Sequence, residues 1–252
     1  MSDFPLIIQK DSFVLRIVFN RAAKGNIINS AMAQELIGAC RDINGDENVR
    51  VVLITAKGKD FCLGSAFEQS SIDKDIVHYK IAGAIGGIEK PVITAIQGKC
   101  LGQGLEIALA SDIRFATSSA QFGFPWVAQG RIPSDGGSQR LPRIIGRGKA
   151  LELLLNAAVI DAKEAELIGL VSKVYGNEVL IKETEQFATE LAQKAPVALR
   201  YIKEAVNKGL DLTEEQGLRL EADLYFLLHT TADRTEGITS FLKKRVPDFK
   251  GK

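Results

Sequence analysis

The chain has 252 residues, of which 46% are hydrophobic and 25% are charged. These values are ordinary for a globular protein, and they exclude intrinsic disorder for the bulk of the chain. Lysines and arginines number 32 against 31 aspartates and glutamates, so the formal net charge is +1. Because a dedicated nucleic-acid-binding protein carries a clear basic excess, we expect no nucleic-acid partner.

Cysteine content and hydropathy bear on where the protein works. The three cysteines are odd in number and widely spaced, which excludes a disulfide framework and a CxxC metal site. No stretch approaches the ~18 uninterrupted apolar residues that span a bilayer. Asp3, Lys10 and Asp11 stand where a signal peptide needs an apolar run. We therefore expect a cytoplasmic protein with no membrane association and no bound metal.

The first part of the chain alternates strand and helix signals. Residues of the β-branched and aromatic types predict strands at 5–9 and 13–19. Asn29 and Ser30 are suited to cap a helix whose apolar positions recur every three to four residues. The run VRVVLITA at 49–56 is apolar almost throughout, which is typical of a sheet buried on both faces.

The same alternation continues to about residue 147. A helix is predicted at 71–88, and buried strands are predicted at 92–97 and 111–117. This order of elements predicts an α/β layered core. Beyond the core, a series of segments has helical spacing and is broken mainly by VSKVY at 171–175. These segments are 148–157, 161–168, 179–194, 197–209, 213–229 and 232–244. The apolar faces of the last helices leave two alternatives open, packing on the chain's own core or docking on a neighbouring subunit.

Several common chemistries lack their residues. His78 and His229 are the only histidines, and no local motif pairs either with a serine or cysteine nucleophile. GRGK at 146–149 lacks the spacing of a phosphate-binding P-loop, and GQG at 102–104 lacks the third glycine of the dinucleotide fingerprint. We expect neither ATP nor NAD chemistry and no separate cofactor.

Two glycine-rich turns follow predicted strands. In FCLGSAFEQ (61–69), Gly64 lets the backbone turn sharply and leaves a peptide N–H exposed to a ligand. In KPVITAIQGKCLGQGLEIALASDIRFA (90–116), a helix begins near Gly102, and the first N–H groups of a helix attract negative charge. Two such donors on one thioester carbonyl form an oxyanion hole for an enolate. Glu106 lies one turn into the helix, within reach of such a carbonyl. Tight packing is the competing explanation for the glycines.

A third segment, AQFGFPWVAQGRIPSDGGSQRLPRIIG (120–146), completes the set. In this order and spacing the three segments resemble the crotonase family of enoyl-CoA hydratases and isomerases. The resemblance covers essentially the whole chain, because it extends to FNRAAKGNIIN (19–29), AKEAELIGLVSKVY (162–175) and ADRTEGITSFLKKRVPDFK (232–250).

The resemblance implies an α/β fold, a crotonase-like spiral of ββα units at 1–195. A helical region at 196–252 then builds homotrimers, which in the family often pair into dimers of trimers. The implied ligand is an acyl-CoA thioester, with coenzyme A present as part of the substrate.

The family's binding residues carry over by position. The backbone N–H groups of Ser65 and Gln103 become the oxyanion donors, and Gln103 replaces a usual glycine, so its side chain borders the site. The implied CoA-binding positions are Lys24, Asn26, Ile28, Gly64, Ala66 and Gly102, joined by Phe241 and Lys244 of an adjacent subunit at the nucleotide.

Hydratases of the family use two glutamates around one water. Glu106 matches the first, but the second position falls on Trp126. An indole exchanges no proton at neutral pH, although it offers an apolar wall for a flat or cyclic acyl group. Asp135, in PSDGG, is the available replacement acid, since partial desolvation beside Trp126 raises the pKa of a carboxyl. The competing interpretations are a turn aspartate and an aspartate paired with Arg131.

The leading hypothesis is an enoyl-CoA hydratase that acts through a thioester enolate. GKCLGQGLEIALA (98–110) and KGNIIN (24–29) are similar to hydratases of cyclic dienoyl-CoA, which favours a cyclic or conjugated substrate. Double-bond isomerisation is a close alternative, because Glu106 alone suffices for it. Hydrolysis or C–C cleavage of an acyl-CoA is a third reaction. A catalytically weak acyl-CoA-binding protein is the alternative from another class.

Overall fold

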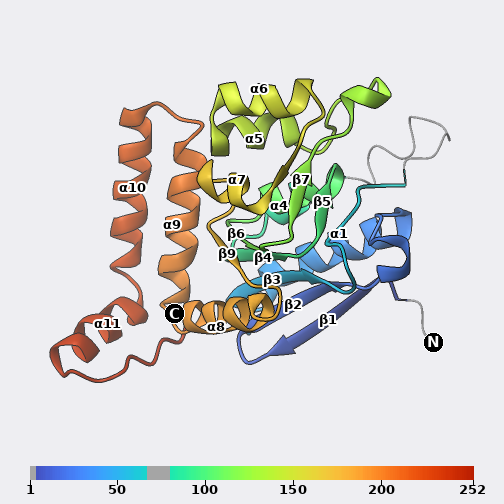
Figure 1. Ribbon diagram of the computed structural model, residues 1–252. Helices are drawn as coiled ribbons and strands as arrows, with labels where there is room; N and C mark the ends of the chain where they lie inside the picture. Colours follow the sequence, from blue (N-terminus) through green and yellow to red (C-terminus); the bar gives the residue numbers. More distant parts are fainter. Residues whose placement is uncertain (1–3, 67–79) are drawn as a thin grey trace.

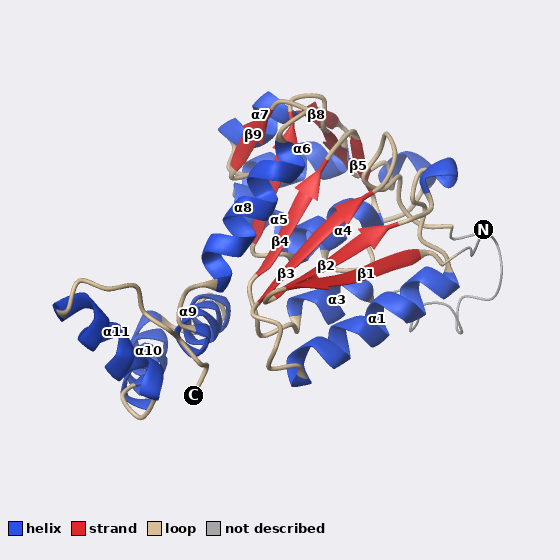
Figure 2. Cartoon of the chain, turned by 90° about the horizontal axis from the view of Figure 1, so that it is seen from below, coloured by secondary structure: helices blue, strands red, loops and turns tan. Residues whose placement is uncertain are grey.

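The computed structural model describes residues 4–66 and 80–252. Its centre is a six-stranded sheet in the order β1-β2-β3-β4-β6-β9 (Figures 1 and 2). β1 and β2 form an antiparallel pair, and the remaining neighbours run parallel. These strands are Leu6–Asp11, Val14–Phe19, Val51–Ala56, Val92–Ile96, Ile113–Thr117 and Lys173–Tyr175.

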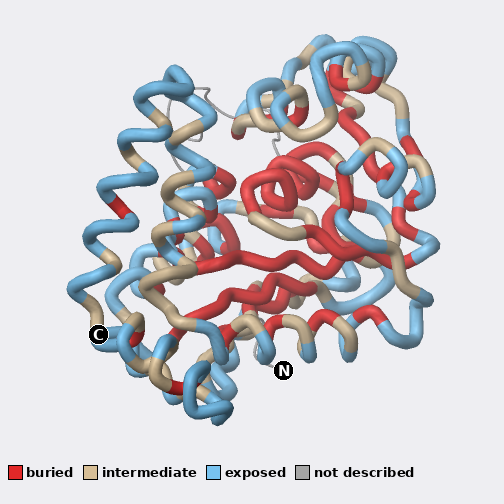
Figure 3. Tube along the Cα trace, turned by 90° about the vertical axis from the view of Figure 1, so that its left-hand side faces the viewer, coloured by how far each residue is buried: buried red, intermediate tan, exposed pale blue. Residues whose placement is uncertain are grey.

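Helices cover both faces of this sheet. They are α1 (Ser30–Gly45), α3 (Ile81–Gly86) and α4 (Gln103–Ala110) on one face and α8 (Leu180–Ala192) on the other. Neighbouring residues of one strand point to opposite faces, so Ile54 joins the first core and Leu53 the second. This two-sided burial explains the almost continuously apolar sequence of β3 and β4. Figure 3 shows the buried segments gathered at the centre of the molecule.

A second, three-stranded sheet has the order β5-β7-β8. Its strands are Lys99–Leu101, Gln121–Gly123 and Val159–Asp161, and α5 (Gly137–Ile145), α6 (Arg147–Leu155) and α7 (Ala162–Leu167) lie around it (Figure 1). Strands of three residues are too short to show a hydrophobic period, so the sequence pattern does not predict them. They matter here because Gly102 follows β5 and Trp126 comes soon after β7.

The last three helices stand apart from the sheets (Figure 2). They are α9 (Pro196–Gly209), α10 (Glu214–Leu228) and α11 (Ala232–Leu242). Lys203 of α9 forms an ion pair with Asp112 of the core, 2.8 Å between Nζ and Oδ2. Large apolar side chains remain exposed on these helices, among them Ile202, Val206, Leu218, Tyr225, Phe226, Phe241 and Leu242.

Most predicted elements are present. Asn29 caps α1, because its Oδ1 accepts the N–H of Met32 (3.0 Å). Of the helix predicted at 71–88, residues 71–79 lie outside the described residues, as does His78, and α3 occupies the rest. Within residues 4–66 and 80–252, no helix is long and apolar enough to cross a membrane.

Candidate active site

The turn at Gly64 is fixed against the loop that precedes α1. Ile28 N–H donates to Gly64 O (2.9 Å), and Ala66 N–H donates to Ile28 O (2.8 Å). Ile28 and Ser65 thus form a parallel bridge in which both hydrogen bonds of Ile28 go to the neighbours of Ser65. The N–H of Ser65 consequently points away from Ile28. Gly64 has φ +115°, which residues with a side chain rarely adopt.

The second turn leads from β5 into α4. Leu101 N–H donates to Cys62 O (2.9 Å), which places this turn beside the first. Gly102 has φ +52° and ψ −124°, and Gln103 is the first residue of α4. The first N–H groups of a helix lie outside its internal hydrogen-bond ladder and form the positive end of its dipole. The two predicted oxyanion donors, Ser65 and Gln103, therefore lie on adjacent turns.

Glu106 lies one turn into α4 and is fully buried. Its Oε1 accepts hydrogen bonds from the backbone N–H groups of Asp135 (2.7 Å) and Gly137 (2.9 Å). Its Oε2 has no hydrogen-bond partner in the described part of the chain. Burial raises the pKa of Glu106 from 4.5 to about 7, against the opposing effect of the two N–H donors. A carboxyl with this pKa both binds and releases protons near neutral pH.

Asp135 belongs to the loop between β7 and α5. Its Oδ2 accepts hydrogen bonds from Ala82 N–H (2.8 Å) and from Nε2 of Gln103 (3.3 Å). Burial raises the pKa of Asp135, and these donors act in the opposite direction. Arg140 holds the same loop, because its Nη1 donates to Asp135 O (2.9 Å). A second buried acidic residue is thus packed against Glu106.

Trp126 faces the two glycine turns, an orientation that the sequence leaves open. A β-carbon on Gly102 would stand 2.6 Å from Cζ2 of the indole, and one on Gly64 would stand 4.0 Å from Cη2. The side chain is buried, and its Nε1 has no hydrogen-bond partner among residues 4–66 and 80–252. Arg131, the alternative partner considered for Asp135, places its guanidinium 4.5 Å from the indole ring centre. Trp126 therefore forms a wall beside the predicted oxyanion donors.

The positions predicted to bind coenzyme A differ in how they are placed. Lys24 and Ala66 are exposed, whereas Ile28 is fully buried. Asn26 is also fully buried, and its Nδ2 donates to Lys57 O and to a second backbone oxygen (both 2.9 Å). Its Oδ1 accepts the N–H of Arg21 (2.9 Å). The Asn26 side chain therefore holds its own loop together, and its backbone N–H also donates within the loop, to Arg21 O (3.1 Å).

Phe241 and Lys244 lie at the end of α11, well apart from α4 within one chain (Figures 1 and 2). Phe241 is 83% exposed. The fold does not bring these two residues to Glu106. Their contribution to the site of an adjacent subunit stays a prediction.

Three residues that build the site are not among the sequence candidates. Gly137 and Ala82 supply N–H groups to the two acids, and Arg140 holds the loop. The signal for Gly137 is the glycine pair after Asp135, since a β-carbon there would stand 2.9 Å from Phe124. Only glycine lets this loop approach the core so closely. Backbone donors such as Ala82 leave no trace in side-chain chemistry.

Comparison with known proteins decides the family. The family model described as enoyl-CoA hydratase/isomerase matches residues 9–252. The chain belongs to the enoyl-CoA hydratase/isomerase family. This confirms the resemblance seen in the sequence and the prediction of an enzyme of this family.

Individual members of the enoyl-CoA hydratase/isomerase family are similar over the full chain. The crotonyl-CoA hydratase of Syntrophomonas wolfei is 37% identical over 97% of each chain. The 2,3-dehydroadipyl-CoA hydratase of Escherichia coli is 33% identical over 98% of this chain and 99% of its own. A crystal structure of an enoyl-CoA hydratase from Bacillus anthracis, 34% identical, matches with a TM-score of 0.95 over 98% of this chain and 100% of that chain. The crotonase fold with its helical C-terminal region is thereby confirmed.

Proposed function

We propose that this protein is an enoyl-CoA hydratase in which Glu106 moves the proton. One observation carries the proposal: a buried carboxyl with a pKa of about 7 keeps Oε2 without a partner in the described chain while two backbone N–H groups fix Oε1. That combination gives a fixed orientation and a reactive oxygen beside the start of α4. A carboxyl so placed contributes roughly 10²–10⁴-fold to proton-transfer rates.

The reaction adds water across the C2=C3 bond of a 2-enoyl-CoA. The water oxygen bonds to C3 while Oε2 of Glu106 takes up a water proton. The C2=C3 π pair forms a C1=C2 bond, and the carbonyl π pair moves onto the thioester oxygen. Backbone N–H groups of Ser65 and Gln103 stabilise the resulting enolate. Glu106 then returns a proton to C2, so one water is added in total. Asp135, the second buried acid, orients the water.

A double-bond isomerase is the second candidate, and the position of Trp126 favours it. By the sequence resemblance, Trp126 stands where family hydratases carry their second glutamate, and its indole faces both glycine turns. Isomerisation moves a proton from C4 to C2 or the reverse, which needs one carboxyl. The apolar wall of Trp126 suits a flat or cyclic acyl group in either reaction.

Product mass separates the candidates. Purified protein is incubated with linear, branched and cyclic enoyl- and dienoyl-CoAs, beside the variants Glu106→Gln and Asp135→Asn. Glu47→Gln, at an exposed site on another part of the chain, is the matched control. A product heavier by one water, lost in both site variants, supports the hydratase. A product of unchanged mass, separated from the substrate by chromatography and abolished only by Glu106→Gln, supports the isomerase. Tight thioester binding without turnover would leave an acyl-CoA-binding protein.

We also propose that the chain forms trimers, singly or in pairs. A groove of about 530 Å³ between α9 and α10 is lined mainly by apolar side chains, including Tyr201, Leu218 and Phe226. Large apolar side chains that lie exposed together along these helices favour an interaction surface. Mass photometry should give three or six times the chain mass.

Cytoplasmic location is also part of the proposal, and the three free, buried cysteines support it.

A further inference from the structure

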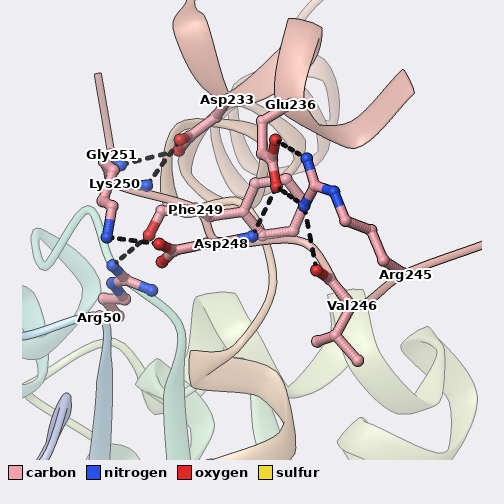
Figure 4. Close-up of polar contacts among 9 residues, drawn as sticks. All are labelled: Arg50, Asp233, Glu236, Arg245, Val246, Asp248, Phe249, Lys250 and Gly251. Carbon is pink, nitrogen blue, oxygen red and sulfur yellow. Dashed lines mark hydrogen bonds and ion pairs between the residues drawn. The ribbon is translucent and has the colours of Figure 1, made fainter. Parts of the chain in front are cut away.

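The segment that follows α11 turns back and binds both its own helix and the core (Figure 4). We call this set of contacts the C-terminal clamp, and it comprises Arg50, Asp233, Glu236, Arg245 and residues 246–252. α11 packs extensively against no other described helix or strand. Polar contacts of the clamp join α11 to the segment that follows it, and Arg50 joins that segment to the core.

Asp233 anchors the end of the segment to the first turn of α11. Its Oδ1 accepts the N–H of Lys250 (2.7 Å), and its Oδ2 accepts the N–H of Gly251 (2.8 Å). Its own N–H donates to Lys252 O (3.1 Å). Asp233 is 2% exposed. Hydrogen bonds to a buried charge are stronger than neutral ones, and a lost partner is costly.

Glu236 lies within α11 and fixes the turn that follows the C-terminal end of this helix. Its two carboxylate oxygens accept hydrogen bonds from both Nη atoms of Arg245 (2.5 and 2.6 Å), and Oε1 also accepts the N–H of Asp248 (2.8 Å). The Arg245 guanidinium lowers the pKa of Glu236 to about 2. Lys244, which precedes Arg245, has φ +50°. The backbone that carries Lys244 is thus held in one specific turn.

Arg50 joins the segment to the core just before β3. Its Nη2 donates to Phe249 O (2.7 Å), and its Nη1 donates to Ala192 O (3.2 Å) at the end of α8. The guanidinium also lies 3.7 Å from the ring centre of Phe13. Arg50 is buried, so one side chain connects the clamp, α8 and the edge of the sheet.

We infer that the C-terminal clamp sets the position of Phe241 and Lys244 for coenzyme A bound to an adjacent subunit, which makes Arg50 and Asp233 positioning residues for nucleotide recognition. The inference rests on the proposed function and assembly. Lys244 and Phe241 lie on the stretch between the two anchors, Asp233 and Arg245. The orientation of Phe241 and Lys244 relative to the core therefore depends on Arg50. Arg50 itself lies in a different part of the fold from Glu106.

The test uses two thioesters of the same acyl group, one of coenzyme A and one of pantetheine, which lacks the nucleotide. Arg50→Met and Asp233→Asn should raise KM for the CoA thioester about tenfold, or about 1.4 kcal/mol, with kcat unchanged. KM for the pantetheine thioester should not change. Lys244→Met should show the same pattern. Arg16→Met is the control, because Arg16 makes a partly exposed ion pair with Glu185.

Each other outcome overturns the inference. Equal effects on both thioesters, a fall in kcat, or dissociation into single chains by mass photometry would show a purely structural clamp. If Arg50→Met does not fold, Arg50→Lys takes its place in the test. Lysine keeps the positive charge but cannot make both guanidinium hydrogen bonds in the same geometry. Calorimetry with coenzyme A itself keeps the test independent of turnover. A weaker CoA affinity in the variants then supports the clamp even where no thioester reacts.

Discussion

The indole of Trp126 lies over Gly102, so closely that a β-carbon on Gly102 would stand 2.6 Å from Cζ2. Gly102 is the residue before Gln103, where α4 and its predicted oxyanion donor begin. The proposed wall of the acyl site and the predicted oxyanion turn are therefore one packed unit. A side chain added at Gly102 must displace the indole.

Replacing Gly102 with alanine should lower kcat at least tenfold. The new β-carbon collides with a rigid ring, and φ of +52° with ψ of −124° is strained for any residue with a side chain, at a cost of about 1–3 kcal/mol. Steady-state kinetics and thermal unfolding measure the two effects. Gly148→Ala is the control, because nothing lies within 4 Å of the new atom there. Normal kcat in Gly102→Ala would show that the turn takes no part in the reaction.

Replacing Trp126 with glutamate should increase the hydration of linear 2-enoyl-CoAs. The change places a carboxyl at the position where the sequence resemblance predicts the second glutamate, and we expect a gain of at least tenfold in kcat for a step of this kind. The variant Trp126→Gln has a side chain of the same size as glutamate but no ionisable group, so it should show no gain. Equal rates for both variants would mean that position 126 does not contact the attacking water.

Glu106 should make stability depend on pH in a defined direction. Its pKa is raised to about 7 in the folded chain against 4.5 ordinarily, so the folded state binds more protons between these two values. The free energy of unfolding therefore falls as pH rises through this window, by about 3 kcal/mol. Glu106→Gln removes this dependence. Relative to the original chain, the variant should gain stability between pH 4.5 and pH 8.

Urea unfolding at several pH values tests that prediction. Glu47→Gln, at an exposed site, should follow the original chain at every pH. An unchanged stability difference between Glu106→Gln and the original chain across the window would show that Glu106 is ionised throughout.

Asp135→Asn should lower hydration by roughly 10²-fold if Asp135 orients the water. An amide oxygen can still accept from Ala82 and Gln103, but the amide carries no charge and its NH₂ group only donates, so the second acceptor for the water is lost. Isomerase activity should fall far less, because Glu106 keeps both of its N–H donors. Asp42→Asn, at an exposed site on α1, is the control. Parallel loss of both activities would mean that Asp135 only supports the loop.

Long elements were predictable from sequence because their periodicity is strong. The apolar run of β3 and the Asn29 cap of α1 appear in the structure as expected. Local pattern also placed Glu106 on the first turn of a helix that begins beside Gly102. Each of these features depends on residues close together in the chain.

Features that join distant segments were not predictable. The N–H of Asp135 meets Glu106 from 29 positions away, and Arg50 meets Phe249 from 199 positions away. The acceptors or donors there are backbone atoms, which every residue carries. The orientation of Trp126 depends likewise on β5 and β7, which are too short to leave a pattern.

Deuterium incorporation tests the role of Glu106 most directly. The reaction is run in ²H₂O with the best enoyl-CoA of the panel, using the original chain, Glu106→Gln and Glu47→Gln. We predict a product that has gained water and carries deuterium at C2, formed equally well with Glu47→Gln. Glu106→Gln should lose at least 10²-fold in rate. Deuterium at C2 at an undiminished rate in Glu106→Gln would contradict the assignment of Glu106 as the proton-transfer group.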